Sequence, residues 1–590
     1  MTIIIKFLCI IAPIITFTAI LTVVMRTFYR IKYRMFGLRR ISGETHIFSE
    51  LNDRSLALAK SLGKSGNLIV FADIIDKNEE AHLDLVDAAK ELGAILFRKD
   101  IASIKIRNER SKRKVSFYLV SDDETEKMRH AKHIIDKYNS DCCKLYLFSD
   151  ALETELLMNK YSQKSGAKGD GENKKIKGIR INETRFLVYK YLWDKGASLF
   201  KEVSAADNKV KEINVAVLGY GKHGKELVKA LLWYCQIPGY KVNITVIDSD
   251  ESAESRFNAE FGAEIKTNEH FYSSEDMRYH ISFSNLTFGT DSFVEKVKND
   301  LLYNHFFVCF GDDHLNLEAS NVIRREILRE RIKRELGTAE RKTVEAKAKS
   351  NDNILRAILE SVKITTIIRN NDVIELAKDD FEILGDFNRY YDVKNFSINS
   401  DMIDAGLEEH ALYSPEELAK KESECKALGI ADLKEYVKKQ GEPKFCFNDY
   451  CFYSSVSHAI HRNLRSKAEF EPPAGIYKDI FESTATIDKA KLSDESYMKS
   501  LKDRLKKENI ELEGKTIDTL KKSGTLKKSG TLAELCAVAE IEHVRWNAYM
   551  RTEGYTFGVG MDETNKGKIK IHKNLVPVTK LTPEDILKDI

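Results

Sequence analysis

Apolar and polar positions alternate along the first part of the chain in blocks that predict strands and helices in turn. Short β-branched or aromatic runs are typical of buried strands, and the segments between them carry apolar residues at helical spacing. Such alternation predicts a parallel, doubly wound sheet with helices on both faces. The predicted strands are 67–73, 94–98, 115–120 and 144–148, and the predicted helices are 79–92 and 125–138.

These elements predict a Rossmann-like α/β domain over residues 46–162. The segment FSELNDRS (48–55) stands where a phosphate-binding turn is expected, but it contains no glycine. Close approach of a diphosphate to the backbone requires glycine at such a turn. We therefore interpret this domain as degenerate and expect it to act as a scaffold or dimerisation unit. A linker rich in Gly, Ser and Lys is expected over 163–182.

A second α/β block, expected over 183–400, contains the motif with the clearest chemistry. Gly219 permits a tight turn, Gly221 lets a diphosphate reach the backbone, and Gly224 lets the following helix pack against its strand. Asp248 ends the next strand and is placed to accept hydrogen bonds from a ribose diol. The order is strand, glycine turn, helix and strand, at 215–218, 219–224, 225–233 and 242–247.

Further strands are expected to end at the same edge of this sheet. The run HFFVCFGDD (305–313) reads as a strand that ends in glycine and acid residues, and ligands bind at such ends in parallel sheets. A helix is expected from about Leu315, and a strongly charged helical insertion over 325–360, before the strand pattern KITTIIR resumes. The predicted nucleotide-binding residues are Gly219, Tyr220, Gly221, Lys222, His223, Gly224, Asp248, Asp250, Gly311 and Asp312.

The N-terminus carries an uncharged apolar run over residues 7–25, bounded by Lys6 and Arg26. A helix of this length rises about 28 Å, which matches the hydrocarbon core of a bilayer. Basic residues crowd the segment 27–45, so the positive-inside rule places the rest of the chain in the cytoplasm. We expect one transmembrane helix within 1–26, in contact with lipid through 3–25, and a location in the inner (cytoplasmic) membrane.

Composition narrows the function classes. The net charge is +3 with both signs interspersed, so nucleic acid is not an expected partner. The nine cysteines show no zinc-binding spacing, and no metal site is predicted. Residues 401–515 form a mixed connecting region whose stretch 450–465 holds Ser454, Ser455, His458 and His461 on an expected helix. These four lack a nucleophile elbow, and we interpret them as polar packing or ligand contacts.

Two family resemblances follow from these motifs. Residues 211–330, with VLGYGKHG, ITVIDSD and FFVCFGDDHLNLEASNVIR, resemble the TrkA-N (RCK-type) NAD-binding family. That resemblance implies contacts from Gly219, Gly221, Gly224 and Asp248 to NAD or a related nucleotide. Because domains of this family commonly pair, it also implies a homo-oligomer.

The segment 516–590 resembles the ryanodine-receptor (RyR) repeat domain, including its bacterial forms, and is expected to be mainly α-helical. The resemblance rests on LAELCAVAEIEHVRWNAYMRTEGYTFG (532–558) and IHKNLVPVTKL (571–581). Aromatic faces beside histidine and basic groups would suit a base and a phosphate, although Trp546 and His543 could instead hold the small domain together. The predicted ligand pocket comprises Glu540, His543, Arg545, Trp546, Tyr549, Tyr555, His572 and Lys573.

The combination of a membrane helix, a TrkA-N-like domain and an RyR-like domain resembles bacterial membrane proteins proposed to sense nucleotides, some of them in antiphage defence. We therefore expect a membrane-anchored nucleotide sensor with no catalytic residues. Two alternatives stay open. One is a regulatory subunit of an ion (potassium) transporter. The other is an NAD-dependent or NAD-consuming enzyme, for which Asp312, Asp313 and His314 are the nearest candidates.

Overall fold

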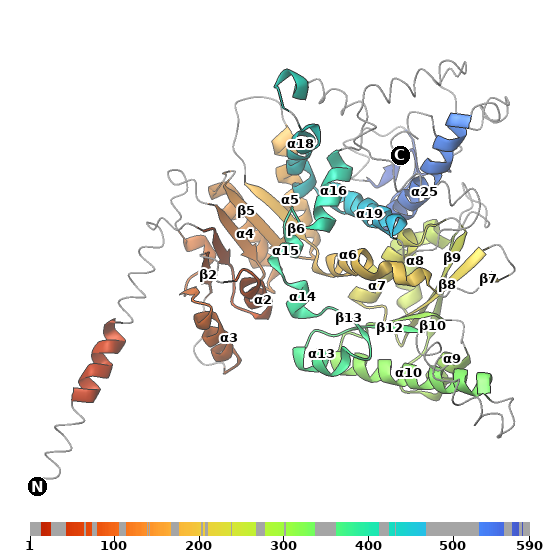
Figure 1. Ribbon diagram of the computed structural model, residues 1–590, viewed down its shortest axis with the longest axis horizontal. Coiled ribbons are helices and arrows are strands. Elements are labelled where there is room, and N and C mark those ends of the chain that lie inside the picture. The colour runs from red at the N-terminus through yellow and green to blue at the C-terminus, as the bar shows by residue number, and fades with distance from the viewer. Residues whose placement is uncertain are drawn as a thin grey trace, which may run out of the picture. The chain divides into compact units, whose positions relative to one another are not determined.

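The computed structural model (Figure 1) divides into two compact units. Unit 1 comprises residues 1–181 and 391–395, and unit 2 comprises residues 182–390 and 396–590. The structure describes residues 13–24, 43–63, 67–73, 80–104, 114–138, 140, 142–166, 176–201, 205–206, 210–237, 239–266, 278–299, 303–336, 362–411, 424–430, 432–467, 530–559, 569–577 and 581.

Unit 1 is built on a six-stranded parallel sheet of order β3-β2-β1-β4-β5-β6. This is the strand order of a doubly wound dinucleotide-binding fold. Strands β1 and β4 are buried along their whole length, as expected for parallel strands covered on both faces. The strands are β1 (Thr45–Phe48), β2 (Leu68–Ala72), β3 (Ile95–Phe97), β4 (Val115–Leu119), β5 (Cys143–Phe148) and β6 (Lys177–Ile181). The helices are α2 (Asp53–Ser61), α3 (Glu80–Glu91), α4 (Glu124–Lys137) and α5 (Leu152–Gly166), with a 3₁₀ turn, η1, at Ile101–Ser103.

The predicted parallel α/β fold of this region is confirmed, but the sheet extends further than the pattern indicates. Strand β6 lies within the range expected to be a linker. Its sequence KGIRI is interrupted by Arg180, which is nevertheless buried because its guanidinium donates to Thr154 Oγ1 (3.0 Å) and to the Ala151 carbonyl (2.9 Å). A buried arginine that is satisfied by distant groups hides the apolar signature of a strand.

Unit 2 repeats the topology, with a parallel sheet of order β10-β9-β8-β11-β12-β13. A short strand, β7 (Ala205–Ala206), pairs antiparallel with β8. The strands are β8 (Val210–Leu218), β9 (Tyr240–Asp248), β10 (Tyr279–Asn285), β11 (His305–Val308), β12 (Lys363–Ile367) and β13 (Glu382–Leu384). The helices are α6 (Glu183–Lys195), η2 (Gly196–Phe200), α7 (Lys222–Tyr234), α8 (Ala253–Lys266), α9 (Asp291–Asn299), α10 (Asp313–Leu336), α13 (Asn371–Ala377) and α14 (Phe387–Tyr390). Helix α15 (Val393–Phe396) belongs to unit 1 except for its last residue.

Helix α10 shows where the expected helical insertion differs from the structure. It begins at Asp313 and continues through the predicted start of the insertion at residue 325. Ala319, Ile323 and Ile327 recur at a spacing of four residues and are buried in the core of unit 2. The first half of α10 is therefore a regular layer of the Rossmann-like fold. Residues 337–361 of the expected insertion lie outside the described residues.

A group of helices completes unit 2. Helices α16 (Asp401–Ala411), α18 (Leu433–Phe447) and α19 (Asp449–Ser466) pack on one another, and α19 confirms the helix expected over 450–465. Helix α25 (Gly530–Thr552) packs on α7 and α8, and the short strands β14 (Thr556–Phe557) and β15 (Ile571–His572) follow it.

A buried ion cluster holds the end of α25 against α6 and α7. Arg185 donates from Nε to Glu226 (2.8 Å) and from Nη2 to Glu553 (2.9 Å), and Lys229 Nζ lies 2.9 Å from the same Glu553 oxygen. Burial alone would raise the pKa of Glu553, but the charges of Arg185 and Lys229 outweigh it and lower the pKa to about 2. Trp233 and Tyr549 pack edge to face beside this cluster, with ring centroids 6.4 Å apart.

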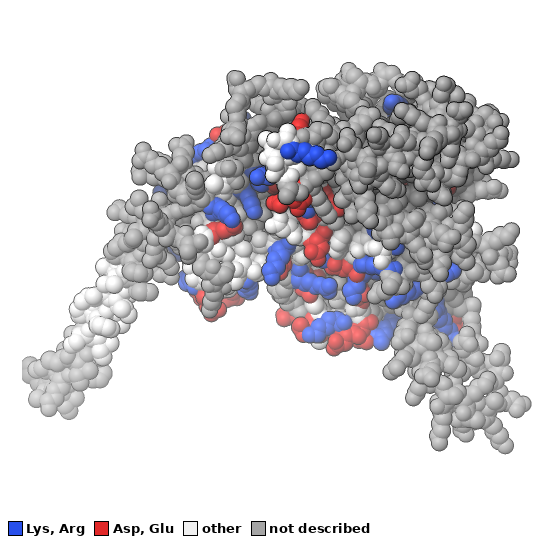
Figure 2. All heavy atoms as spheres, turned by 45° about the horizontal axis from the view of Figure 1, so that its top comes forward, with Lys and Arg blue, Asp and Glu red and all other residues white. Residues whose placement is uncertain are grey.

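Residues 13–24 of the predicted membrane segment are helical. Its apolar side chains are exposed, including Phe17 at 65% and Val23 at 62%, and Figure 2 shows no charged side chain on its visible face. Among the residues that the structure describes, no helix combines the length and the apolar character that a membrane crossing requires. Residues 1–12 and 25–42 of the expected anchor and juxtamembrane segment lie outside the described residues.

The ion cluster predicts a pH-dependent contribution to stability. Because the folded pKa of Glu553 lies below its usual value of 4.5, this contribution is present above pH 4.5 and is lost as the pH falls toward 2. Glu553→Gln should lower the free energy of unfolding at neutral pH by about 3 kcal/mol, since it leaves Arg185 and Lys229 with only one carboxylate, Glu226, between them. Urea unfolding of both proteins between pH 7 and pH 3 measures this.

Glu540→Gln on the same helix is the matched control. Glu540 is 42% exposed and pairs with Arg278 at 3.4 Å, so its loss should cost less than about 1 kcal/mol. Equal effects of the two substitutions would contradict a structural role for the buried cluster.

Candidate functional site

The candidate site lies at the carboxyl edge of the unit 2 sheet. Strand β8 lies in the middle, with β9 on one side and β11 on the other, so the direction of winding reverses between β8 and β11. Ligands of doubly wound folds bind in the crevice at this reversal. The glycine turn predicted from the sequence connects β8 to α7 at this point.

Two glycines of this turn are required by its geometry. Gly219 has φ +92°, and a Cβ there would come within 2.7 Å of the Cys309 carbonyl oxygen. A Cβ on Gly224 would come within 1.8 Å of the Gly219 carbonyl oxygen. The Cys309 thiol lies beneath the turn and donates to the carbonyls of Leu218 (3.1 Å) and Gly219 (3.3 Å), and burial raises the pKa of this thiol. The turn is thus packed on its inner side with little room to spare.

Gly221 differs because it faces outward. It is the N-cap residue of α7, with φ −73° and ψ −165°, and no side chain of the described residues caps the helix. A Cβ on Gly221 would meet no described atom within 4 Å. The first N–H groups of a helix have no partner within the helix, and its positive dipole end favours an anion. The start of α7 therefore has the geometry of a phosphate-binding site.

Asp248 lies beside this turn at the end of β9. Its Oδ2 accepts from the backbone N–H of Tyr220 (2.5 Å), and its Oδ1 accepts from that of Asp250 (2.8 Å). A carboxylate has about four acceptor sites, so two stay available for the hydroxyls of a ribose. The carboxylate of Asp250 accepts hydrogen bonds from Ser252 and pairs with Arg256 in its own loop. These contacts lower the pKa of Asp250.

Sequence reasoning missed Arg369, which follows β12 at the same edge. Its Nη2 lies 2.8 Å from Nε2 of His223 on the first turn of α7, and its backbone N–H donates to Asp313 (2.8 Å). An exposed guanidinium at this position is suited to bind a phosphate oxygen. One signal in the sequence could have indicated Arg369: it is the basic residue that ends the apolar strand pattern KITTIIR.

The other predicted nucleotide-binding residues have different surroundings. The ring of Tyr220 is buried and packs edge to face on Phe283 (5.4 Å) and Phe257 (6.3 Å), away from the turn. Lys222 is exposed on the first turn of α7. Gly311 has φ +94°, and Asp312 accepts from the Leu315 N–H (2.8 Å) at the start of α10.

The corresponding edge of unit 1 is filled by its own side chains. Asn52 caps α2 in a reciprocal arrangement with Ser55, and its Nδ2 donates to the Val120 carbonyl (2.9 Å). Arg54 donates to the same carbonyl (2.8 Å). The Ser55 N–H, one of the groups that a phosphate would use, is thereby satisfied within the protein.

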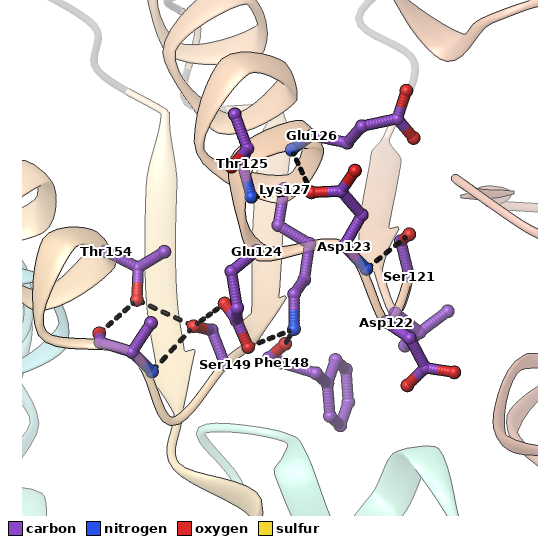
Figure 3. Close-up of polar contacts among 12 residues, drawn as sticks. Ser121, Asp122, Asp123, Glu124, Thr125, Glu126, Lys127, Phe148, Ser149 and Thr154 are labelled. Carbon is purple, nitrogen blue, oxygen red and sulfur yellow. Dashed lines mark hydrogen bonds and ion pairs between the residues drawn. The ribbon is translucent and has the colours of Figure 1, made fainter.

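The neighbouring strand ends of unit 1 are closed in the same way. Figure 3 shows Glu124, Lys127 and Ser149 pointing toward one another where β5 ends and α4 begins. Ser149 Oγ donates to Glu124 (2.5 Å), and Lys127 Nζ donates to Glu124 (2.7 Å) and to the Phe148 carbonyl (2.9 Å). The ion pair of Glu124 and Lys127 thus fills this strand end with the protein's own charged groups.

Three of the predicted RyR pocket residues meet near the C-terminus. His543 Nε2 bonds with the Val576 carbonyl (2.8 Å), and its ring stacks on Trp546 (5.6 Å between centroids). His572 packs edge to face on the same indole at 4.9 Å. These contacts join α25 to the segment 571–577.

The remaining predicted pocket residues face other neighbours. Arg545 is 1% exposed and forms a bidentate pair with Glu542. Tyr549 packs on Trp233, and Tyr555 lies 6.1 Å from Tyr450 between ring centroids. Two pocket residues lie nearer the surface, namely Glu540 in its pair with Arg278 and the exposed Lys573.

The glycine turn predicts a sharp contrast in stability. Gly224→Ala should destabilise the protein by about 2–3 kcal/mol, because its Cβ overlaps a backbone oxygen that cannot move without opening the turn. Gly221→Ala should cost less than about 1 kcal/mol, since its Cβ meets open space. Thermal unfolding of both variants measures this. Equal destabilisation would show that the inner side of the turn is not the tightly packed one.

Comparisons of the chain with protein-family models, with curated proteins and with solved structures found no match. The TrkA-N and RyR resemblances therefore rest on the sequence motifs of residues 211–330 and 516–590 alone.

Proposed function

We propose that unit 2 binds a nucleotide carrying a diphosphate, NAD or a related molecule, at the turn 219–224 and that α25 responds to its binding. One observation carries this proposal. Helix α7 begins at Gly221 without a side-chain cap from the described residues and beside open space. Asp248 would bind the ribose, and Arg369 and His223 would bind phosphate oxygens.

A role in sensing is favoured over catalysis because the acidic residues at the carboxyl edge of the unit 2 sheet already accept hydrogen bonds from the backbone. Asp312 caps α10, and Asp313 accepts from the backbone N–H groups of Arg369 (2.8 Å) and Asn370 (2.7 Å). Carboxylates committed to backbone groups are poorly placed to act as a base toward a substrate. The enzyme hypothesis therefore has less support than the sensor.

Helix α7 provides the connection between the nucleotide and α25. Its first turn contains the glycine site, and its second half carries Lys229 and Trp233, which contact Glu553 and Tyr549 near the end of α25. A nucleotide that binds one position of α7 more tightly would shift the population of α25 positions accordingly. The RyR-like region would then act as the responding element.

We further propose that residues 3–25 anchor the protein in the cytoplasmic membrane, with the remainder in the cytoplasm and the chain assembled as a homo-oligomer. The exposed apolar helix 13–24 and the basic residues after it support the anchor. The resemblance to TrkA-N and RyR-containing bacterial proteins supports a sensor or effector in antiphage defence. The alternative function is regulation of a separate ion transporter, and co-purification with a multi-span membrane protein would favour it.

Substituting the N-cap of α7 separates binding from folding. Gly221→Ser supplies a side chain that caps the helix, so the melting temperature should stay equal or rise. The same hydroxyl occupies the proposed phosphate position, so nucleotide affinity should fall by about tenfold or more. The nucleotide is chosen from NAD, ATP and ADP-ribose by a calorimetric screen against the wild type.

Asn52→Ala in unit 1 is the matched control, because it removes a cap where no nucleotide is expected. It should cost about 1 kcal/mol of stability and leave nucleotide affinity unchanged. An unchanged affinity in Gly221→Ser would rule out the glycine turn as the receptor.

The membrane proposal makes its own prediction. The double substitution Phe17→Asp and Leu21→Asp should release the chain from lipid vesicles in a flotation assay, since each aspartate at the centre of a bilayer costs about 2.5–3.5 kcal/mol. Leu152→Asp and Leu156→Asp change two exposed leucines of α5 in unit 1 and should leave flotation intact. Flotation of both variants would contradict an anchor in residues 3–25.

A further inference from the structure

A buried charged cluster joins α16, α19 and α25 within unit 2, apart from the glycine turn. Its two carboxylates each have an arginine of their own. Arg462 Nη1 donates to Glu409 (2.8 Å), and Arg545 forms a bidentate pair with Glu542 at 3.0 and 2.7 Å. His458 bridges the two, with Nδ1 3.2 Å from Glu409 and Nε2 3.4 Å from Glu542.

A third arginine in this cluster has no carboxylate of its own. Arg465 follows Arg462 by three residues on α19 and is 9% exposed. Its Nε is enclosed and makes no hydrogen bond, and none of its nitrogens forms an ion pair within the described part of unit 2. Burial outweighs the more distant charges of Glu542 and Glu409 and lowers the pKa of Arg465 to about 10.

His461 lies one helical turn before Arg465, so both side chains share one face of α19. It is 0% exposed, and the Gln236 backbone is the one described group that approaches its ring closely enough to interact with a ring nitrogen. Burial and the charges of Arg465 and Arg545 lower its pKa well below the usual value, and the nearby backbone of Gln236 opposes this only in part. At least one nitrogen of this buried imidazole is therefore unsatisfied by the described residues, which is costly unless a ligand or water completes it.

The balance of charge indicates what such a ligand would be. Three arginines face two carboxylates in this cluster, and the nearby Arg278 is paired separately with Glu540. Among the described residues of the cluster, one positive charge is therefore left without a carboxylate. A guanidinium binds the oxygens of a phosphate or carboxylate with two parallel hydrogen bonds. The imidazole beside it adds one further bond, as a donor or as an acceptor from a protonated phosphate oxygen, according to its tautomer. The site is close to solvent, because the next residue, Ser466, is exposed at the end of α19.

We propose that Arg465 and His461 form a second binding site, for a small oxyanion such as phosphate or the phosphate group of a nucleotide. The site joins α19 to α25 through the same cluster, so its occupation would stabilise the packing of these helices. The proposal is independent of nucleotide binding at the glycine turn.

The test compares two arginines of one helix, using the full-length protein and inorganic phosphate as the probe, against chloride at equal ionic strength. Wild type should show a melting temperature that rises with phosphate. Arg465→Met should melt higher than wild type without phosphate, because an uncompensated buried charge is replaced by an apolar side chain. It should also bind phosphate about tenfold more weakly or worse.

Arg462→Met is the matched control. It should melt lower than wild type, because Glu409 loses its guanidinium, yet it should keep the phosphate-dependent rise. Gly221→Ser should also keep that rise, which distinguishes this site from the glycine turn. The proposal is overturned if phosphate does not stabilise wild type, if Arg465→Met keeps the full rise, or if Arg465→Met melts lower than wild type without phosphate. Loss of the rise in Gly221→Ser alone would assign the phosphate to the turn instead.

Discussion

The start of α7 has no side-chain cap from the described residues, and the candidate site depends on this gap in hydrogen bonding. A helix start leaves N–H groups that need an acceptor, and most helices supply one from Ser, Thr, Asp or Asn. Gly221 supplies none, and the surrounding turn holds it open because Gly219 and Gly224 pack against backbone oxygens on the inner side. An anion is the group that best completes such an arrangement.

The two units show that topology alone does not create this site. Both have a six-stranded parallel path with the same strand order. In unit 1 the equivalent helix is capped by Asn52, and a carboxylate, Glu124, lies at the neighbouring strand end. In unit 2 the helix start is uncapped by the described residues, and an arginine, Arg369, lies at the edge. The two helix starts thus differ through a few side chains on equivalent loops.

Unit 2 also contains ion pairs that are buried or half-buried where its helices meet. Glu553 joins α25 to α6 and α7, and Glu542 joins α25 to α19. Buried ion pairs contribute less to stability than apolar packing, but they tolerate little displacement because each lost partner leaves a charge in a low-dielectric interior. Such contacts favour a small number of defined helix positions. This property suits a region that responds to a ligand.

Local patterns in the sequence predicted most of the fold and the centre of the site. Gly219, Gly221, Gly224 and Asp248 could be placed because their spacing is dictated by the turn itself. Strand β6 was missed because Arg180 interrupts its apolar run. The start of α10 was predicted to within two residues, but its continuation past residue 325 was assigned to an insertion because charged residues surround its apolar stripe. Arg369 and Arg465 could not be assigned from the sequence, since their roles depend on neighbours far away in the chain. Helical spacing placed His458 and His461 on one helix, but only the packing of α16 and α25 separates a bridged histidine from an unsatisfied one.

Hydrogen–deuterium exchange of the full-length protein with and without saturating nucleotide tests the central claim most directly, because it reports on the backbone N–H groups themselves. A nucleotide bound at the glycine turn should slow exchange at residues 221–224, while the capped start of α2 in unit 1 should exchange equally in both states. Unchanged exchange at residues 221–224 would contradict the claim. This holds whether the nucleotide instead slows exchange at the start of α2 or slows it at neither helix.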